Sequence, residues 1–166
     1  DTDTANMAIR AALTGHLVLS TIHTNSAWGT ISRLIDMGVP PYLLASTLNT
    51  TVAQRLLRLL CPHCKEEQPF SHEHFPPGFE PDREITKHYV AKGCNECFHT
   101  GYKGRKAVYE VITIDHELAN LIKESEFNVG EALKERSIKT LSENAFEIFE
   151  RGDTTIEEVY ALLMTN

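Results

Sequence analysis

Long apolar runs and an excess of positive charge are both missing from this 166-residue sequence. No stretch approaches the roughly 20 apolar residues that a membrane-spanning helix needs, so we expect no transmembrane segment. Lysine and arginine number 16 against 23 aspartates and glutamates, which gives a formal net charge of −7. An acidic chain attracts the phosphates of DNA and RNA poorly, so we expect no nucleic-acid partner. Hydrophobic residues nevertheless make up 42%, a globular balance that excludes a mainly disordered chain.

The start of the sequence, Asp1-Thr2-Asp3-Thr4, shows neither an initiator methionine nor a signal peptide. A processed protein and a piece of a longer chain would both begin this way. Residues 16–22 (HLVLSTI) form a short β-branched apolar run, which is typical of a buried strand in a parallel sheet. Such a strand needs neighbours on both sides, and only residues 107–114 (AVYEVITI) look similar. We therefore expect a piece of a longer chain, with the other strands upstream.

Helical patterns fill most of the remaining sequence, which indicates an α/β chain that is mostly helical. Residues 4–13 are alanine-rich, and Ser26 can cap a helix over residues 27–37. A longer helix is predicted over residues 42–60, because Leu44, Leu48, Val52 and Leu56 recur at every fourth position.

The second half of the sequence begins with an irregular stretch and ends in short helices. Residues 65–93 hold four of the seven prolines and three of the eight histidines, which indicates a loop-like insertion. From residue 115 onward the chain looks helical. Three pairs place a capping residue three positions before a glutamate, as helix starts often do: Asn128 with Glu131, Thr140 with Glu143, and Thr155 with Glu158.

Four cysteines occur as two C-x-x-C pairs, Cys61 with Cys64 and Cys94 with Cys97, separated by 29 residues. Two-residue spacing lets both thiolates of a pair reach one ion, and four thiolates in a tetrahedron suit zinc. Because four protein ligands leave no open position, the predicted site is structural rather than catalytic. It divides the chain into three predicted parts: residues 1–60, a metal-binding subdomain at 61–104, and a strand with a helical region at 105–166.

Other interpretations of the cysteines are weaker. Disulfides need an oxidising compartment, and nothing in the sequence indicates export. A thiol oxidoreductase places a strand before its first cysteine and starts a helix at it, whereas a helix-like segment precedes Cys61 here. That interpretation also leaves the second pair unexplained. A site with three cysteines and either His63 or His99 stays open as a less favoured alternative.

His16 and His23 flank the predicted strand at residues 16–22. A histidine beside a buried strand is more often structural than chemical. His23, however, lies at the carboxyl end of that strand, and ligands of open α/β sheets bind at such ends. A functional and a structural role therefore both stay open from the residues alone.

Three segments together resemble one known family. Residues 14–25 (TGHLVLSTIHTN) resemble the His box of the secretion ATPase superfamily. Residues 54–64 (QRLLRLLCPHC) and 94–105 (CNECFHTGYKGR) resemble the type II secretion and type IV pilus assembly ATPases. The resemblance covers nearly the whole chain apart from the proline-rich insertion. The four cysteines favour this branch, since the pilus-retraction relatives generally lack them.

The resemblance implies the C-terminal part of a RecA-like P-loop ATPase domain with a tetracysteine zinc insertion. The chain has no Gly-Lys-Thr/Ser motif, so the phosphate loop, its lysine and the Mg²⁺ ligands are expected outside it. By position, Asp1 resembles the last residue of the Walker B segment, His23 would approach the γ-phosphate of ATP, and His16 would support it. Arg55 would lie on the nucleotide side, although a solvated helix face explains Arg55 and Arg58 equally well. This chain alone is expected not to hydrolyse ATP.

The same resemblance implies a homo-hexameric ring in the cytoplasm, peripheral at the inner membrane, that acts with the inner-membrane platform and the secretion or pilus machinery. A zinc-stabilised adaptor without enzymatic activity is the alternative. The isolated strand at residues 16–22 speaks against it, because an adaptor would not need one. A zinc ribbon that binds nucleic acid is disfavoured by the −7 charge.

Overall fold

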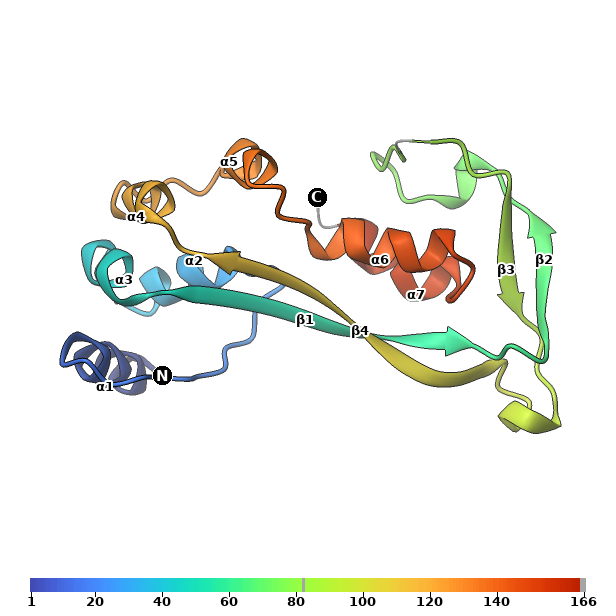
Figure 1. Ribbon diagram of the computed structural model, residues 1–166, viewed down its shortest axis with the longest axis horizontal. Coiled ribbons are helices and arrows are strands. Elements are labelled where there is room, and N and C mark those ends of the chain that lie inside the picture. The colour runs from blue at the N-terminus through green and yellow to red at the C-terminus, as the bar shows by residue number, and fades with distance from the viewer. Residues whose placement is uncertain (82, 165–166) are drawn as a thin grey trace. The chain divides into compact units, whose positions relative to one another are not determined.

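The computed structural model describes residues 1–81 and 83–164, which form two compact units. Unit 1 comprises Asp1–Ala53 and Glu110–Lys139, and unit 2 comprises Gln54–Tyr109 and the residues from Thr140 onward. Two long strands, β1 (Thr50–Leu60) and β4 (Tyr102–Thr113), contribute to both units and pair with each other (Figure 1). The strands are antiparallel, since backbone hydrogen bonds link Ile114 to Asn49 at one end and Cys61 to Gly101 at the other.

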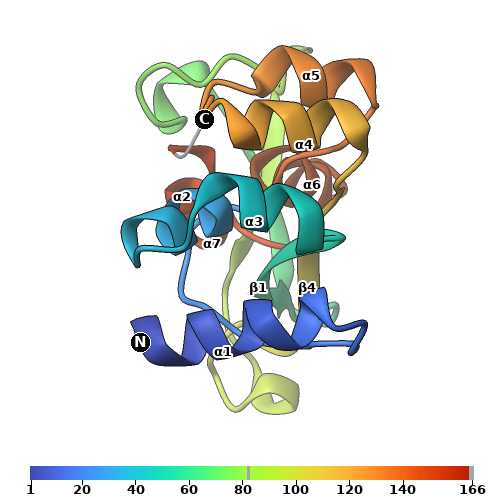
Figure 2. The same cartoon turned by 90° about the vertical axis from the view of Figure 1, so that its left-hand side faces the viewer.

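Unit 1 is built mainly from five helices of the described chain. They are α1 (Thr2–Leu13), α2 (Gly29–Asp36), α3 (Pro41–Thr47), α4 (His116–Lys123) and α5 (Gly130–Glu135). Helix α3 packs against both α4 and α1, and Figure 2 shows it between them. Ile31, Leu44, Leu118 and Ile122 are at most 1% exposed, so α2, α3 and α4 each bury apolar side chains within unit 1.

Unit 2 combines a small hairpin with two helices. Its elements are β2 (Lys65–Pro69), β3 (Lys87–Ala91), α6 (Leu141–Glu150), α7 (Ile156–Leu163) and two 3₁₀ turns, η1 (His72–His74) and η2 (Asn95–Cys97). Strands β2 and β3 are antiparallel, with Lys65 opposite Ala91. The chain between them packs on α6 through aromatic rings, as the 6.0 Å distance between the ring centres of Phe75 and Phe146 shows. The insertion is therefore folded onto the C-terminal helices.

The prediction of a buried parallel strand over residues 16–22 is wrong for this structure. These residues adopt no regular strand, and Leu17 and Leu19 are 85% and 88% exposed. No strand of the described chain pairs with them, so Leu17 and Leu19 have no strand to cover them. The similar run at 107–114 is confirmed as part of β4, but its partner β1 is antiparallel rather than parallel.

The long helix predicted over residues 42–60 is also wrong. Helix α3 ends at Thr47, and the chain continues as β1. Thr50, Thr51 and Val52 are β-branched and favour a strand. Burial along β1 alternates, with Thr51, Ala53 and Leu57 inside, whereas Val52 and Leu56 of the assumed helical stripe are more than half exposed. The two-residue alternation of a strand therefore describes β1, and the apolar residues at every fourth position do not mark a helix there.

Most of the remaining helices follow the sequence pattern. Asp1 caps α1 by accepting from the Thr4 N–H at 2.8 Å, and Ser26 accepts from the Gly29 N–H at 3.0 Å where α2 begins. Four helices follow residue 115, as expected. The α/β class with more helix than strand is thus confirmed for the described chain. Within it, no helix combines the length and the apolar character that crossing a membrane would require.

Candidate metal centre and histidine segment

The four cysteines converge on one point in unit 2. All four Sγ atoms lie within 4.8 Å of one another. The distances are 3.9 Å between Cys61 and Cys94, and 3.8 Å both between Cys64 and Cys97 and between Cys94 and Cys97. A tetrahedron with Zn–S bonds of about 2.3 Å has edges of about 3.8 Å. The sulfurs are therefore placed as a tetrahedral thiolate site requires.

Each cysteine is positioned by an element that ends or starts beside it. Cys61 directly follows β1, and its N–H donates to the Gly101 carbonyl at 2.9 Å, one residue before β4 begins. Cys64 directly precedes β2, while Cys94 caps η2 and Cys97 ends it. Cys61 and Cys97 are buried, and the other two are half-buried. The paired strand ends thus bring two distant segments of the sequence to one centre.

Two backbone N–H groups stabilise negative charge on the Cys97 sulfur. The N–H groups of Cys94 and Gly101 both donate to Cys97 Sγ at 3.2 Å. Burial by itself would raise the pKa of the Cys97 thiol. These two hydrogen bonds, with those from the thiols of Cys64 and Cys94, outweigh that effect and lower the pKa to about 6. The Cys97 thiol therefore loses its proton more readily than an ordinary cysteine.

The Cys64 thiol has the opposite tendency. Burial is the largest cause and raises its pKa to about 12, and hydrogen bonds to the neighbouring cysteine sulfurs act in the same direction. Thiols this close resist sharing more than one negative charge without a cation among them. A divalent ion would remove this penalty, because coordination deprotonates thiols outright. The donor set and its spacing therefore fit a soft divalent metal such as zinc.

Histidines take no part in the sulfur cluster. His63 and His99 are exposed, and the metal-ligand group found among the described residues consists of cysteines alone. The four thiols are free. No helix starts at Cys61, because the chain turns directly from β1 into β2. The geometry therefore favours four sulfur ligands over the three-cysteine, one-histidine alternative and over a thiol oxidoreductase site.

The histidine segment belongs to unit 1 and follows α1. His16 Nδ1 lies 3.0 Å from Thr14 Oγ1 and 3.3 Å from the Ala11 carbonyl oxygen. This ring therefore anchors the start of the segment to the C-terminal turn of α1. The side chain of His23 is exposed, seven residues further on. The structure thus gives the two histidines different surroundings: the ring of His16 is held against a helix, and that of His23 is exposed.

A hydrogen-bonded turn follows His23 directly. Thr24 Oγ1 donates to the Ser26 carbonyl oxygen at 3.0 Å and lies 3.2 Å from Thr30 Oγ1. The N–H of Ala27 donates to Glu110 Oε1 at 2.7 Å, across 83 residues of sequence. Glu110 was not among the sequence-predicted site residues. The sequence does carry a sign of it: Glu110 is a charged residue on the same strand face as Val108 and Ile112, where an apolar residue is expected.

The other candidate nucleotide residues have local contacts. Asp1 caps α1, as described above. Arg55 belongs to unit 2, is half-buried and donates from Nη1 to the Gln54 carbonyl oxygen at 3.0 Å. Arg58, assigned equally to a solvated face, instead binds Glu158 of α7. Among these three side chains, Arg58 thus has a clear structural role.

Comparisons with known proteins agree with one another. The family model described as type II/IV secretion system protein matches residues 1–161. Type II secretion system protein E of Aeromonas hydrophila is 40% identical, and the type IV pilus assembly ATPase TfpB of Acinetobacter baylyi is 44% identical. Each alignment covers 96% of this chain, but only 32% and 28% of the respective relative. The chain therefore spans about a third of the length of these relatives.

Solved structures show the same fold. The pilus retraction motor PilT, solved with bound ADP, matches 97% of this chain and 36% of its own, with a TM-score of 0.63 and 24% identity. The ATPase DotB of Legionella pneumophila matches 99% of this chain and 36% of its own, with a TM-score of 0.59 and 20% identity. The fold expected from the sequence is thus that of known ATPases.

Proposed function

The chain belongs to the type II/IV secretion system protein family, and from this premise we propose that it is the C-terminal portion of the motor domain of an ATPase. The complete protein powers type II secretion or type IV pilus assembly. It works as a homo-hexamer in the cytoplasm, peripheral at the inner membrane, with ATP and Mg²⁺. Its protein partners are the inner-membrane platform and the secretion or pilus machinery. Relatives named for these two tasks, aligned along nearly the whole chain, carry this proposal.

Zinc is the metal we assign to the four cysteines. Four thiolates at tetrahedral spacing fill every coordination position, so the ion would support the fold and would not act in catalysis. Cys61, Cys64, Cys94 and Cys97 would join the end of β1 to the start of β4. The segment 61–104 is then a locally closed metal-binding subdomain, between the parts 1–60 and 105–166.

His23 is the residue of this chain that we assign to the nucleotide. Its exposed imidazole can donate a hydrogen bond to a γ-phosphate oxygen, and such a bond to a charged group is worth about 1.5–3 kcal/mol. His16 fixes the start of the segment through Thr14 and α1. Asp1 and Arg55 are assigned to the nucleotide side by position only. The sequence has no Gly-Lys-Thr/Ser motif, so this chain by itself should not hydrolyse ATP.

ATPase assays on the full-length protein test this function. We expect His23→Ala to lower kcat by about 10- to 100-fold, the equivalent of one hydrogen bond to a charged group. His116→Ala is the matched control, because His116 is also an exposed histidine of unit 1 but lies on α4. The present chain, purified alone and loaded with zinc, should release phosphate no faster than a blank.

The outcomes separate the proposal from the adaptor alternative. Equal kcat values for His23→Ala and the wild type would remove His23 from the mechanism. A full-length product without ATPase activity would favour a zinc-stabilised adaptor. Light scattering of the full-length protein with ATP should give the mass of six chains, and a monomer under all nucleotide conditions would contradict the ring.

A further inference from the structure

The Glu110 carboxylate is buried on the inner face of β4. Its side chain is only 4% exposed, and its neighbours on that face, Val108 and Ile112, are 3% and 0% exposed. Apart from histidine, it is the one charged residue among the fully buried side chains of the described chain. Burying a carboxylate costs free energy unless hydrogen bonds compensate for the lost water. A residue kept at this cost calls for a specific role.

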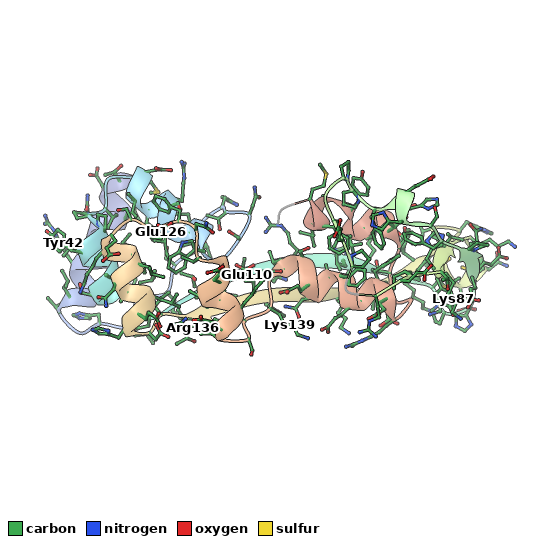
Figure 3. The ribbon with its side chains drawn as sticks, turned by 90° about the horizontal axis from the view of Figure 1, so that it is seen from above. Tyr42, Lys87, Glu110, Glu126, Arg136 and Lys139 are labelled. Atoms are coloured by element: carbon green, nitrogen blue, oxygen red, sulfur yellow. The ribbon has the colours of Figure 1, made fainter. Side chains whose placement is uncertain are left out.

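The Ala27 N–H is one long-range partner of this carboxylate. It donates to Glu110 Oε1 at 2.7 Å, and Ala27 itself is 0% exposed. This short bond is of the charge-assisted type, which is about twice as strong as a neutral one. The bond also lies at the approach to the N-terminus of α2, where the helix dipole favours negative charge. Figure 3 labels Glu110 on its strand.

The bond matters because of what precedes Ala27 in the sequence. His23 lies four residues earlier, and the Thr24–Ser26 and Thr24–Thr30 hydrogen bonds connect the intervening turn. Residues 16–21 are exposed, Ile22 is half-buried, and none of them is part of a strand. Glu110 therefore holds the turn on one side of His23, and on the other side His16 is hydrogen-bonded to Thr14 and α1.

We propose that Glu110 is a positioning residue: by holding the Ala27 N–H, it aims His23 at the nucleotide. This inference rests on the proposed role of His23 in ATP hydrolysis. Glu110 does not itself touch the nucleotide in this scheme. Its loss should thus lower kcat through misplacement of His23, with little change in the KM for ATP.

A double-mutant cycle in the full-length ATPase tests the coupling. We expect Glu110→Leu to lower kcat about tenfold or more, while the KM for ATP changes less than twofold. Glu110→Gln keeps an acceptor oxygen in the same place and should restore kcat to within about threefold of the wild type. In the His23→Ala background, Glu110→Leu should cause little further loss, because the residue it positions is already gone.

Stability and backbone exchange provide readouts besides activity. Ile112→Ala, on the same face of β4, is the control for a merely destabilised core. Hydrogen exchange should become faster around Ala27 in Glu110→Leu and stay near the wild-type rate in Glu110→Gln. If Glu110→Leu does not fold, Glu110→Asp replaces it, since the shorter side chain keeps the charge but loses the reach to Ala27.

The results distinguish the two proposals. If His23→Ala itself leaves kcat unchanged, the proposed function of His23 fails. If His23→Ala lowers kcat but the effect of Glu110→Leu simply multiplies with it, the positioning role is overturned. The same conclusion holds if Ile112→Ala, at equal loss of stability, lowers kcat as much as Glu110→Leu does.

Discussion

Arg58 donates three hydrogen bonds to the carboxylate of Glu158, which lies 100 residues further along the chain. Arg58 Nε and Nη2 donate to Glu158 Oε1 at 2.9 and 2.6 Å, and the Arg58 backbone N–H donates to Oε2 at 2.9 Å. The guanidinium also lies 4.2 Å from the ring centre of Tyr102. Strand β1 is thereby attached to the first turn of α7 within unit 2.

This pair predicts a pH-dependent stability. Burial would raise the pKa of Glu158, but the hydrogen bonds and charge of Arg58 outweigh it and hold the pKa below its usual range. A carboxyl with a depressed pKa in the folded state stabilises the fold fully above its unfolded pKa of about 4.3. That contribution disappears as the pH falls through the folded pKa. Glu158→Gln should therefore cost about 1–2 kcal/mol at pH 7 and less near pH 3.5.

Urea unfolding at both pH values measures this difference. Glu117→Gln is a suitable control, because Glu117 also binds an arginine, Arg136, but its side chain is 68% exposed. Its effect should stay below about 0.5 kcal/mol. A cost for Glu158→Gln that is equal at pH 7 and pH 3.5 would contradict the assignment.

Replacement of a sulfur ligand should release the metal. We expect Cys97→Ser to lose zinc and to lower Tm by about 10 °C or more, because metal binding and local folding are coupled. His63→Ala and His99→Ala remove exposed residues next to the ligands and should keep one zinc per chain. Elemental analysis with thermal unfolding checks all three variants, and loss of zinc from either histidine variant would revive a mixed ligand set.

Gly152 should tolerate no side chain, because two separate costs act there. Its φ of +70° is strained for other residues, and a Cβ would collide with the ring of Tyr89. Gly104 has a φ of +85° with nothing within 4 Å, so Gly104→Ala isolates the backbone cost of about 1–2 kcal/mol. Gly152→Ala should lose about 1–3 kcal/mol more by chemical denaturation. Equal losses of unfolding free energy in the two variants would show that the ring of Tyr89 moves aside at no cost.

His88 predicts a second pH effect, in a higher range. Burial lowers its pKa; a weaker contribution from His74 adds to this, and the charge of Glu157 opposes it. Its Nδ1 has no hydrogen-bond partner among the described residues, and its ring centre lies 4.9 Å from that of Phe70. Neutral His88 thus stabilises the fold fully above a pH of about 6.5, and this contribution declines as the pH falls toward the folded pKa.

The variant His88→Phe should flatten this part of the stability curve. The stability of this variant relative to the wild type should therefore increase as the pH falls from 7.5 to 5.5. The cysteine thiols titrate in both proteins, so their contribution cancels in the difference. Unfolding free energies at the two pH values, with zinc content checked at each, give the result. A difference in unfolding free energy that does not change with pH would show that the charge of His88 does not affect the stability of the fold.

Features that depend on residues close in sequence could be predicted from the sequence, whereas features that depend on distant residues could not. The spacing of Cys61, Cys64, Cys94 and Cys97 predicts one metal site, because two-residue spacing restricts geometry without help from the rest of the fold. Thr140 and Glu143 form the expected capping box for the same reason. Glu158 occupies the equivalent position in α7, yet its carboxylate binds Arg58 instead. A partner 100 residues away leaves no trace in a local pattern.

The errors concern segments whose neighbours decide their structure. Residues 42–60 carry both a fourfold and a twofold apolar repeat, and pairing with β4 selects the twofold one. Residues 16–22 have the composition of a buried strand but no partner strand in the described chain. Glu110 shows the reverse case. Its charge at an apolar position of β4 was visible in the sequence, but its acceptor role depends on Ala27, 83 residues away.

The placement of the sulfur centre also has a consequence for the register of the β1–β4 ladder. Side chains alternate between the two faces of a strand, so a slip of one residue would turn every inward side chain of that strand outward. Cys61 directly follows β1 and Gly101 precedes β4, and a metal at this junction would fix which residues stand opposite each other from there onward. An ion bound there would thus set the pairing of strands of 11 and 12 residues, well beyond its own ligands.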